Sequence, residues 1–272
     1  MNRRTAALLL AAALLAALLA ATAVAPPYLS VPVPERAYLG PFEAPPFGLD
    51  ERGVPLHEIA LQGAAIVTVP AILSGLLVMV LATFAGLVRC AGIGWVDGVI
   101  QVGSELVGAL PRLVVVLVVA LLLPKEWKVL LPIGLAWAVL AAPGAMDEAA
   151  AYAGRIGGAR FVEALRAHGF SRWRIYGYHV IWLNLRPVIV RQGAEVTMQV
   201  VFLEIALSYL ALRQNEPSFT HADSEFSWAS LLYKGYTALL GVPLLHALWL
   251  GLALVAAVAI LAQSVRYAAR AR

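Results

Sequence analysis

The sequence predicts an all-α polytopic membrane protein with about six transmembrane helices. Of its 272 residues, 61% are hydrophobic and only 13% are charged, whereas about 25% of the residues in soluble domains are charged. Apolar runs near the ~20 residues that a helix needs to cross a bilayer recur along the chain. Basic residues also gather at alternate ends of these runs, as they do in membrane proteins that obey the positive-inside rule.

The first apolar run, residues 1–25, is expected to be an N-terminal transmembrane helix. Arg3 and Arg4 precede it, and its end, Ala23-Val24-Ala25, imitates the cleavage site of a signal peptide. The alternative is therefore a cleaved signal peptide. We favour a retained helix because two prolines follow the possible cleavage point, where proline hinders cleavage.

A segment rich in proline, glycine and charge, residues 26–61, is predicted to be an external loop. The remainder, 62–272, is predicted to hold five more transmembrane helices, with the fourth span ending near Pro143-Gly144 and a cytoplasmic segment at 147–187. The expected spans are 62–88, 99–123, 129–146, 188–212 and 236–262.

The distribution of basic residues predicts that both termini are cytoplasmic. Six spans place the termini and the 147–187 segment on one side of the membrane. The opposite side holds only Arg36, Arg52, Lys125, Lys128, Arg213 and Lys234. The cytoplasmic side then carries Arg3, Arg4, Arg89, Arg155, Arg160, Arg166, Arg172, Arg174, Arg186, Arg191, Arg266, Arg270 and Arg272.

The basic segment between the fourth and fifth runs is predicted to form two helices that meet at a corner. Val162 and Leu165 give the first helix an apolar side, and Gly169 stands where a helix ends in a left-handed residue. Phe170 is placed to pack back on Leu165, and the hydroxyl of Ser171 can cap the next helix. The residues alone leave two alternatives open: a docking element for a cytosolic protein, or a solvated basic loop that only sets topology.

The same segment resembles the EAA loop of the permease subunits of ABC importers. The resemblance is carried by Glu163-Ala164-Leu165, by Gly169 six residues after the glutamate, and by the run from 166 to 175 with His179. It is most similar to the second permease of the oligopeptide, dipeptide and nickel importers. Two residues depart from the family pattern, Leu165 in place of alanine and Trp182 in place of proline.

A second register has the same spacing, because Gly154 follows Glu148-Ala149-Ala150 by the same interval. We prefer the register of Glu163, since only this one aligns the Ser-x-x-Arg-Ile pattern and His179. Two further segments resemble the family in the right order. Residues 46–53 are similar to Gly-Thr-Asp-x-x-Gly-Arg-Asp, and residues 226–229 are a partial match to Pro-Ser-Trp-Gly.

The resemblance implies the permease fold of a type I ABC importer, a non-enzymatic subunit of the bacterial inner membrane that carries peptides or a related solute such as a nickel chelate or an opine. It implies a heterodimer with a homologous second permease, two ATPase subunits or domains that use ATP and Mg, and an extracytoplasmic solute-binding protein. The family's ATPase-coupling positions correspond to Glu163, Ala164, Leu165, His168, Gly169, Phe170, Ser171 and Arg172.

Several kinds of chemistry are not indicated by the sequence. No glycine-rich loop ends in Gly-Lys-Ser/Thr, so we expect no ATP or other cofactor on this chain and no catalytic residues. The histidines are scattered, so no metal site is expected, and the net charge of +4 is better explained by topology than by nucleic acid. A secondary transporter or channel that needs no ATPase is the alternative function, and a membrane scaffold is a third.

Four charged residues fall within the predicted spans: Glu105, Arg112, Glu195 and Glu204. An unpaired charge in hydrocarbon is costly, so these side chains are expected to face the bundle interior or a translocation path. Arg191 lies four residues before Glu195, a spacing that allows the two to pair. We hypothesise that Arg112 lines the path and favours a substrate with a carboxylate.

Overall fold

The chain is all-α in the part that the structure, a computed structural model, describes: residues 3–124, 129–157, 160–214, 227–238 and 244–269. These residues contain no strand, and Leu49 and Pro55 form an isolated β-bridge. The helices are α1 (Arg3–Val24), the 3₁₀ turn η1 (Pro34–Arg36), α2 (Leu56–Ala91), α3 (Gly94–Gly108), α4 (Arg112–Leu122), α5 (Leu130–Gly157), α6 (Arg160–Ala167), the π-helical η3 (Arg174–Leu185), α7 (Arg186–Gln214), α8 (Trp228–Ala238) and α9 (Leu245–Ala269).

Several of these helices can cross a bilayer. By length and composition α1, α2, α5 and α9 qualify, and the bent pair of α3 and α4 would make a fifth span. The prediction of an all-α protein with several membrane spans is therefore confirmed. The predicted fifth span corresponds to α7, which is long enough to cross a bilayer but is not among the candidate spans found in the described residues.

The predicted third span is not one straight helix. α3 and α4 meet at an angle of 79°, with the break at Leu110 and Pro111. Proline has no backbone N–H to donate and disfavours helical geometry in the residue before it. The span predicted over 99–123 is therefore broken: α3 ends at Gly108, and α4 begins at Arg112, directly after Pro111.

Pro143, in contrast, does not interrupt its helix. The predicted end of the fourth span near Pro143-Gly144 was wrong, because α5 continues through both residues to Gly157. Small side chains let α5 pack closely on α2, and this packing outweighs the single hydrogen bond that Pro143 removes. The buried alanines of α5 recur every three or four residues, at Ala138, Ala142, Ala145, Ala149 and Ala153.

The remaining span boundaries also shift. α2 begins at Leu56, before the predicted start at residue 62. The predicted sixth span, 236–262, is divided: α8 is a separate short helix and the membrane helix α9 begins at Leu245. Residues 239–243 between them lie outside the described residues.

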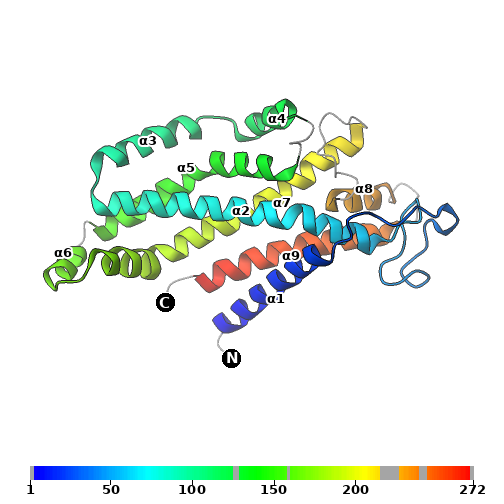
Figure 1. Cartoon of the computed structure of the whole chain (residues 1–272), viewed down its shortest axis with the longest axis horizontal. Coiled ribbons are helices and arrows are strands. Elements are labelled where there is room, and N and C mark those ends of the chain that lie inside the picture. Colours follow the sequence, from blue (N-terminus) through cyan, green and yellow to red (C-terminus); the bar gives the residue numbers. More distant parts are fainter. Residues whose placement is uncertain (1–2, 125–128, 158–159, 215–226, 239–243, 270–272) are drawn as a thin grey trace.

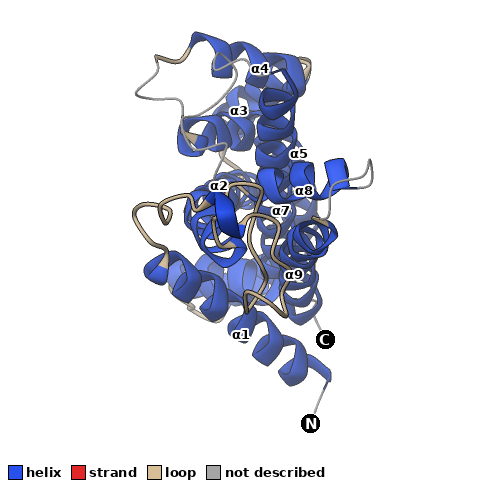
Figure 2. Cartoon of the chain, turned by 90° about the vertical axis from the view of Figure 1, so that its right-hand side faces the viewer, coloured by secondary structure: helices blue, strands red, loops and turns tan. Residues whose placement is uncertain are grey.

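The helices form an elongated bundle in which successive passes alternate in direction (Figure 1). The start of α1, the end of α9 and the corner beyond α6 lie toward one end, and the 25–55 segment and α8 lie toward the other. Viewed along the bundle, α2 and α7 are central, whereas α3 with α4 and α1 occupy opposite edges (Figure 2). The predicted arrangement, with the termini and the central basic segment on one side, agrees with this layout.

Gly75 allows the two central helices to approach closely. A Cβ atom there would clash with Thr197 Oγ1 and would lie 2.7 Å from the carbonyl oxygen of Gly193, both on α7. We expect Gly75→Leu to force α2 and α7 apart and to lower the free energy of unfolding in mixed micelles by ~1–3 kcal/mol. Gly103→Leu is the matched control, since nothing lies within 4 Å of a Cβ added at this position of α3. Equal losses in the two variants would contradict the close approach.

Candidate functional site

The predicted helix end at Gly169 is confirmed. Gly169 has a φ of +75°, in the left-handed region. Its N–H donates to the carbonyl of Arg166 at 2.9 Å, and the N–H of Phe170 donates to the carbonyl of Leu165 at 3.2 Å. This pair of bonds satisfies the last carbonyls of α6 and defines a Schellman ending. The chain therefore turns sharply after α6.

The predicted cap at Ser171 is also present. The backbone N–H of Arg174 donates to Ser171 Oγ at 3.4 Å, and the N–H of Ile175 donates to the Ser171 carbonyl at 3.0 Å. The helix that follows is wider than expected, because it is π-helical over the twelve residues of η3. Short π-helical turns often occur at functional sites, and here a longer one leads from the corner into α7.

Burial divides the corner into an anchored side and an outward side. Val162 is 3% exposed and belongs to the main hydrophobic core, and Leu165 and Phe170 pack against that core. The other predicted coupling residues are all exposed: Glu163, Ala164, His168, Gly169, Ser171 and Arg172. The structure thus brings the predicted residues together on one small surface. Their role in coupling stays a prediction.

Aromatic and cationic contacts hold this corner to η3. The His179 ring lies edge-on to Phe170 and Phe161, with centroid separations of 5.8 and 6.1 Å. The Arg174 guanidinium lies 4.7 Å from the centre of the Phe170 ring. Arg166 donates to the hydroxyl of Tyr176 at 2.7 Å. Because both helices take part in these contacts, the corner is one unit with η3 and not a loose loop.

The alternative register lies in a different environment. Glu148 accepts hydrogen bonds from Arg191 and Gln192 of α7, so its carboxylate joins two helices of the bundle. Gly154 is inside α5, where an added Cβ would lie 3.5 Å from Arg89 Cγ. The glutamate and glycine of this register are part of the packing between helices. Only Glu163 and Gly169 stand at a helix end on the outer surface.

The four charged residues of the predicted spans do not form one site. Glu204 is fully buried, as expected, and accepts a hydrogen bond from Ser208 at 2.9 Å. Glu195 and Arg112 are half-buried, on α7 and at the start of α4, whereas Glu105 lies on the exposed face of α3. No ion pair joins any two of these four in the described part of the chain. The possible pairing of Arg191 with Glu195 is also not found, because Arg191 pairs with Glu148.

Contacts with α5 account for much of the polarity of α7, and sequence reasoning missed them. Trp137 of α5 donates to Gln199 of α7 at 3.0 Å. Arg191 and Gln192 bind Glu148, further along the same helix α5. The signal was present as polar residues at helical spacing along α7, at 191, 192, 195 and 199. Their partners on another helix could not be identified from spacing alone.

A buried ion pair lies at the opposite end of the bundle. Asp50 has 0% exposure, and Lys234 Nζ of α8 donates to its carboxylate at 2.6 Å. The backbone N–H groups of Arg52 and Val54 also donate to Asp50, each at 2.8 Å. Burial alone would raise the pKa of Asp50. The hydrogen bond and positive charge of Lys234 and the two backbone donors outweigh burial, so the pKa lies below its ordinary value of 3.8.

Trp228 completes this contact. It is fully buried, and its Nε1 donates to the carbonyl of Ala60 in α2 at 3.0 Å. Gly63 makes room for the indole, because a Cβ there would lie 2.7 Å from Trp228 Nε1. Asp50, from the segment 46–53 singled out by resemblance, therefore binds α8, and Trp228, the first residue of α8, binds α2. The Asp50–Lys234 pair itself was not anticipated.

Comparison with known proteins adds a distant relative. No family model matches the chain. It is 28% identical over 185 residues to the probable D,D-dipeptide transport system permease protein DdpC of Escherichia coli (strain K12). The match covers 66% of this chain and 59% of the relative, which is less than two thirds of the relative's length. The chain is therefore a multi-span helical membrane protein that is distantly homologous to a D,D-dipeptide transport permease.

Proposed function

We propose that this chain is the permease subunit of a peptide-type ABC importer and forms half of its translocation pathway. The observation that carries the proposal is the corner at Gly169, which presents Glu163, His168 and Arg172 outward while Val162 is buried in the bundle. Distant homology to a dipeptide transport permease supports the same assignment. The transport activity is therefore assigned to a pathway between subunits, with no catalytic step on this chain.

The proposed topology has six passes, with α7 as the fifth and the bent pair α3 and α4 as the third. A polar helix can cross a bilayer when its polar groups bind one another or neighbouring helices. Glu148 and Trp137 of α5 provide such partners for α7. The end that carries α6 is cytoplasmic, because Arg3, Arg89 and Arg266 lie at helix ends on that side.

The proposed partners follow from the type of transporter. A homologous second permease completes the pathway, two cytoplasmic ATPase subunits or domains contact the corner, and an extracytoplasmic binding protein delivers the solute. The ATPases use ATP and Mg and close on nucleotide. Closure of the ATPases moves the corners of the two permeases and shifts them between inward-facing and outward-facing states. The size of this shift depends on how differently the ATPases bind the two states. Peptides, or related solutes such as nickel chelates and opines, are the proposed substrate class.

Co-purification followed by reconstitution tests the assignment. The chain is expressed with a candidate ATPase, second permease and binding protein, purified through a tag on the chain, and placed in liposomes. Recovery of the ATPase and solute-stimulated ATP hydrolysis would support the proposal. Uptake that needs no ATPase would indicate a secondary transporter or channel. Recruitment of a cytosolic protein without any uptake would indicate a scaffold.

Glu163 provides a sharper test of the docking surface. A hydrogen bond to a charged group contributes ~1.5–3 kcal/mol, so Glu163→Ala is expected to weaken ATPase association by about tenfold or more. The measurement is a titration of the reconstituted permease with ATPase, with uptake recorded in parallel. Glu35→Ala is the matched control, an exposed glutamate in the 25–55 segment at the other end of the bundle. Unchanged affinity in Glu163→Ala would count against docking at this surface.

A further inference from the structure

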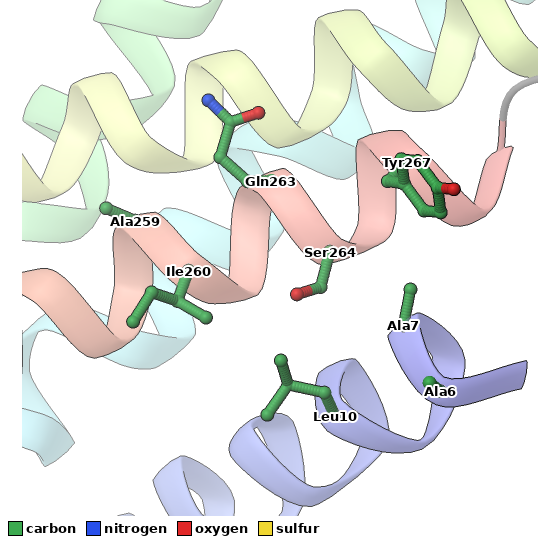
Figure 3. Close-up of a pocket in the computed structure, with 8 residues that line it drawn as sticks. All are labelled: Ala6, Ala7, Leu10, Ala259, Ile260, Gln263, Ser264 and Tyr267. Carbon is green, nitrogen blue, oxygen red and sulfur yellow. The ribbon is translucent and has the colours of Figure 1, made fainter. Parts of the chain in front are cut away.

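A groove of about 490 Å³ lies between α1 and α9, near the ends of these helices that carry the chain termini (Figure 3). Ala6, Ala7 and Leu10 line it from α1. Ala259, Ile260 and Ser264 are among the residues that line it from α9. In Figure 3 the Ser264 and Ile260 side chains point toward α1, and those of Leu10 and Ala7 point toward α9. The two helices therefore face each other across a space that they do not fill.

Small side chains at helical spacing create this space. Residues 6, 7 and 10 form one stripe along α1, and 259, 260, 263, 264 and 267 form one stripe along α9. Three of the lining residues are alanines, so neither helix fills the gap from its own side. In the described part of the chain α1 packs mainly on α2 and α9, and Ala11 is its single buried residue. This helix is therefore poorly covered by protein.

The position and the apolar lining of the groove favour binding of a hydrocarbon chain. Both walls belong to helices that are apolar and long enough to cross a bilayer. Such a groove offers few hydrogen-bond partners to water. An acyl chain in the groove would cover the apolar surface of both helices and keep water away from it. An acyl chain can follow a narrow stripe along two helices, as a bulkier group cannot.

Basic residues at one end of the groove favour a lipid with an anionic headgroup. Arg3 begins α1, and Arg266 lies in the last turn of α9 beside Tyr267, which lines the groove. Tyrosine is enriched where membrane meets water, and basic residues near the membrane surface attract anionic headgroups. The open end of the groove is therefore basic, whereas its length is apolar.

We propose that the groove between α1 and α9 is a binding site for an anionic phospholipid, with an acyl chain along Ala7, Leu10 and Ile260 and the headgroup near Arg3 and Arg266. The lipid supplies packing that α1 does not receive from the protein. This site is independent of the transported solute and of the ATPase.

Lipid retention by the purified full chain tests the proposal. Native mass spectrometry is recorded after equilibration in detergent with phosphatidylglycerol or with phosphatidylcholine. The wild type is expected to retain phosphatidylglycerol in preference. Ala259→Phe and Ala7→Phe fill the groove from either wall and should each lower retention by roughly tenfold, as expected when contacts of two methylene groups are lost. Ala12→Phe is the matched control, on an exposed face of α1 outside the groove.

The headgroup is tested separately. The double variant Arg3→Gln, Arg266→Gln should lower the preference for phosphatidylglycerol over phosphatidylcholine by roughly tenfold without emptying the groove. Equal retention of the two lipids by the wild type would overturn the proposal. Undiminished retention in both groove-filling variants, or recovery of a membrane protein on this face in place of lipid, would also overturn it. Ala259→Leu, a smaller change, serves if a phenylalanine variant fails to elute as a folded monodisperse species.

Discussion

Replacing Asp50 with Asn is expected to lower the free energy of unfolding by ~3–5 kcal/mol. The substitution removes the buried counter-charge of the Lys234 ammonium and leaves it with the more distant and exposed carboxylate of Glu51, at 3.9 Å. Lys234 is 8% exposed and Asp50 is fully buried. The pair connects α8 with the segment that precedes α2, because Lys234 lies 184 residues after Asp50 in the chain. Unfolding in mixed micelles, followed by the fluorescence of the tryptophans, measures the loss.

Two variants show whether the buried charge causes the effect. Arg52 approaches Asp50 at 3.6 Å but its side chain is 40% exposed, so Arg52→Gln should lower stability by less than ~1 kcal/mol. The double variant Asp50→Leu, Lys234→Met replaces both charges by apolar groups and should recover most of the stability lost in Asp50→Asn. A loss below ~0.5 kcal/mol in Asp50→Asn, within the range of ordinary surface changes, would contradict the buried pair.

The same pair predicts how stability depends on pH. Its partners hold the pKa of Asp50 below 3.8, its ordinary value. A carboxylate with a lowered folded-state pKa stabilises the protein at pH values above the unfolded pKa, and this contribution is lost as the pH falls through the folded value. The difference between wild type and Asp50→Asn should therefore be constant from about pH 5 to 8. It should shrink below pH 3.8.

Local features of the fold could be predicted from the sequence, and the contacts between distant segments could not. The Gly169 ending and the Ser171 cap depend on residues within a few positions of each other, and both are present. The membrane helices follow from hydropathy, which is also a local property. By contrast, Glu148 and Arg191 are 43 residues apart, and nothing in either neighbourhood indicates the other.

The two prolines show the same limit. Pro111 and Pro143 each lie within a predicted span, yet Pro111 stands between α3 and α4, and Pro143 lies within a continuous α5. Tertiary packing decides between these outcomes. α5 presents a stripe of buried alanines to α2, whereas in α3, which is described throughout, only Ser104 is buried. A helix that is held along its length can absorb a proline, and a helix at the edge of the bundle bends.

Gly169 should be the most sensitive position for coupled transport. Nothing lies within 4 Å of a Cβ added there, so a side chain would fit, but its φ of +75° is unfavourable for residues other than glycine. Left-handed geometry costs ~1–2 kcal/mol for an ordinary residue. Gly169→Ala is therefore expected to unravel the end of α6 and to lower solute uptake about tenfold, while ATP hydrolysis by the reconstituted complex continues.

Two further variants, Gly169→Asn and Gly154→Ala, make this test specific. Asparagine tolerates the left-handed region, so Gly169→Asn should retain most of the uptake that Gly169→Ala loses. Gly154→Ala is the matched control, because Gly154 has the same spacing from Glu148 but lies inside α5, where alanine stabilises a helix by ~1 kcal/mol. Since coupling is assigned to the corner and not to α5, uptake in Gly154→Ala should be normal. Loss of coupling in Gly154→Ala together with normal coupling in Gly169→Ala would move the docking surface to the other register.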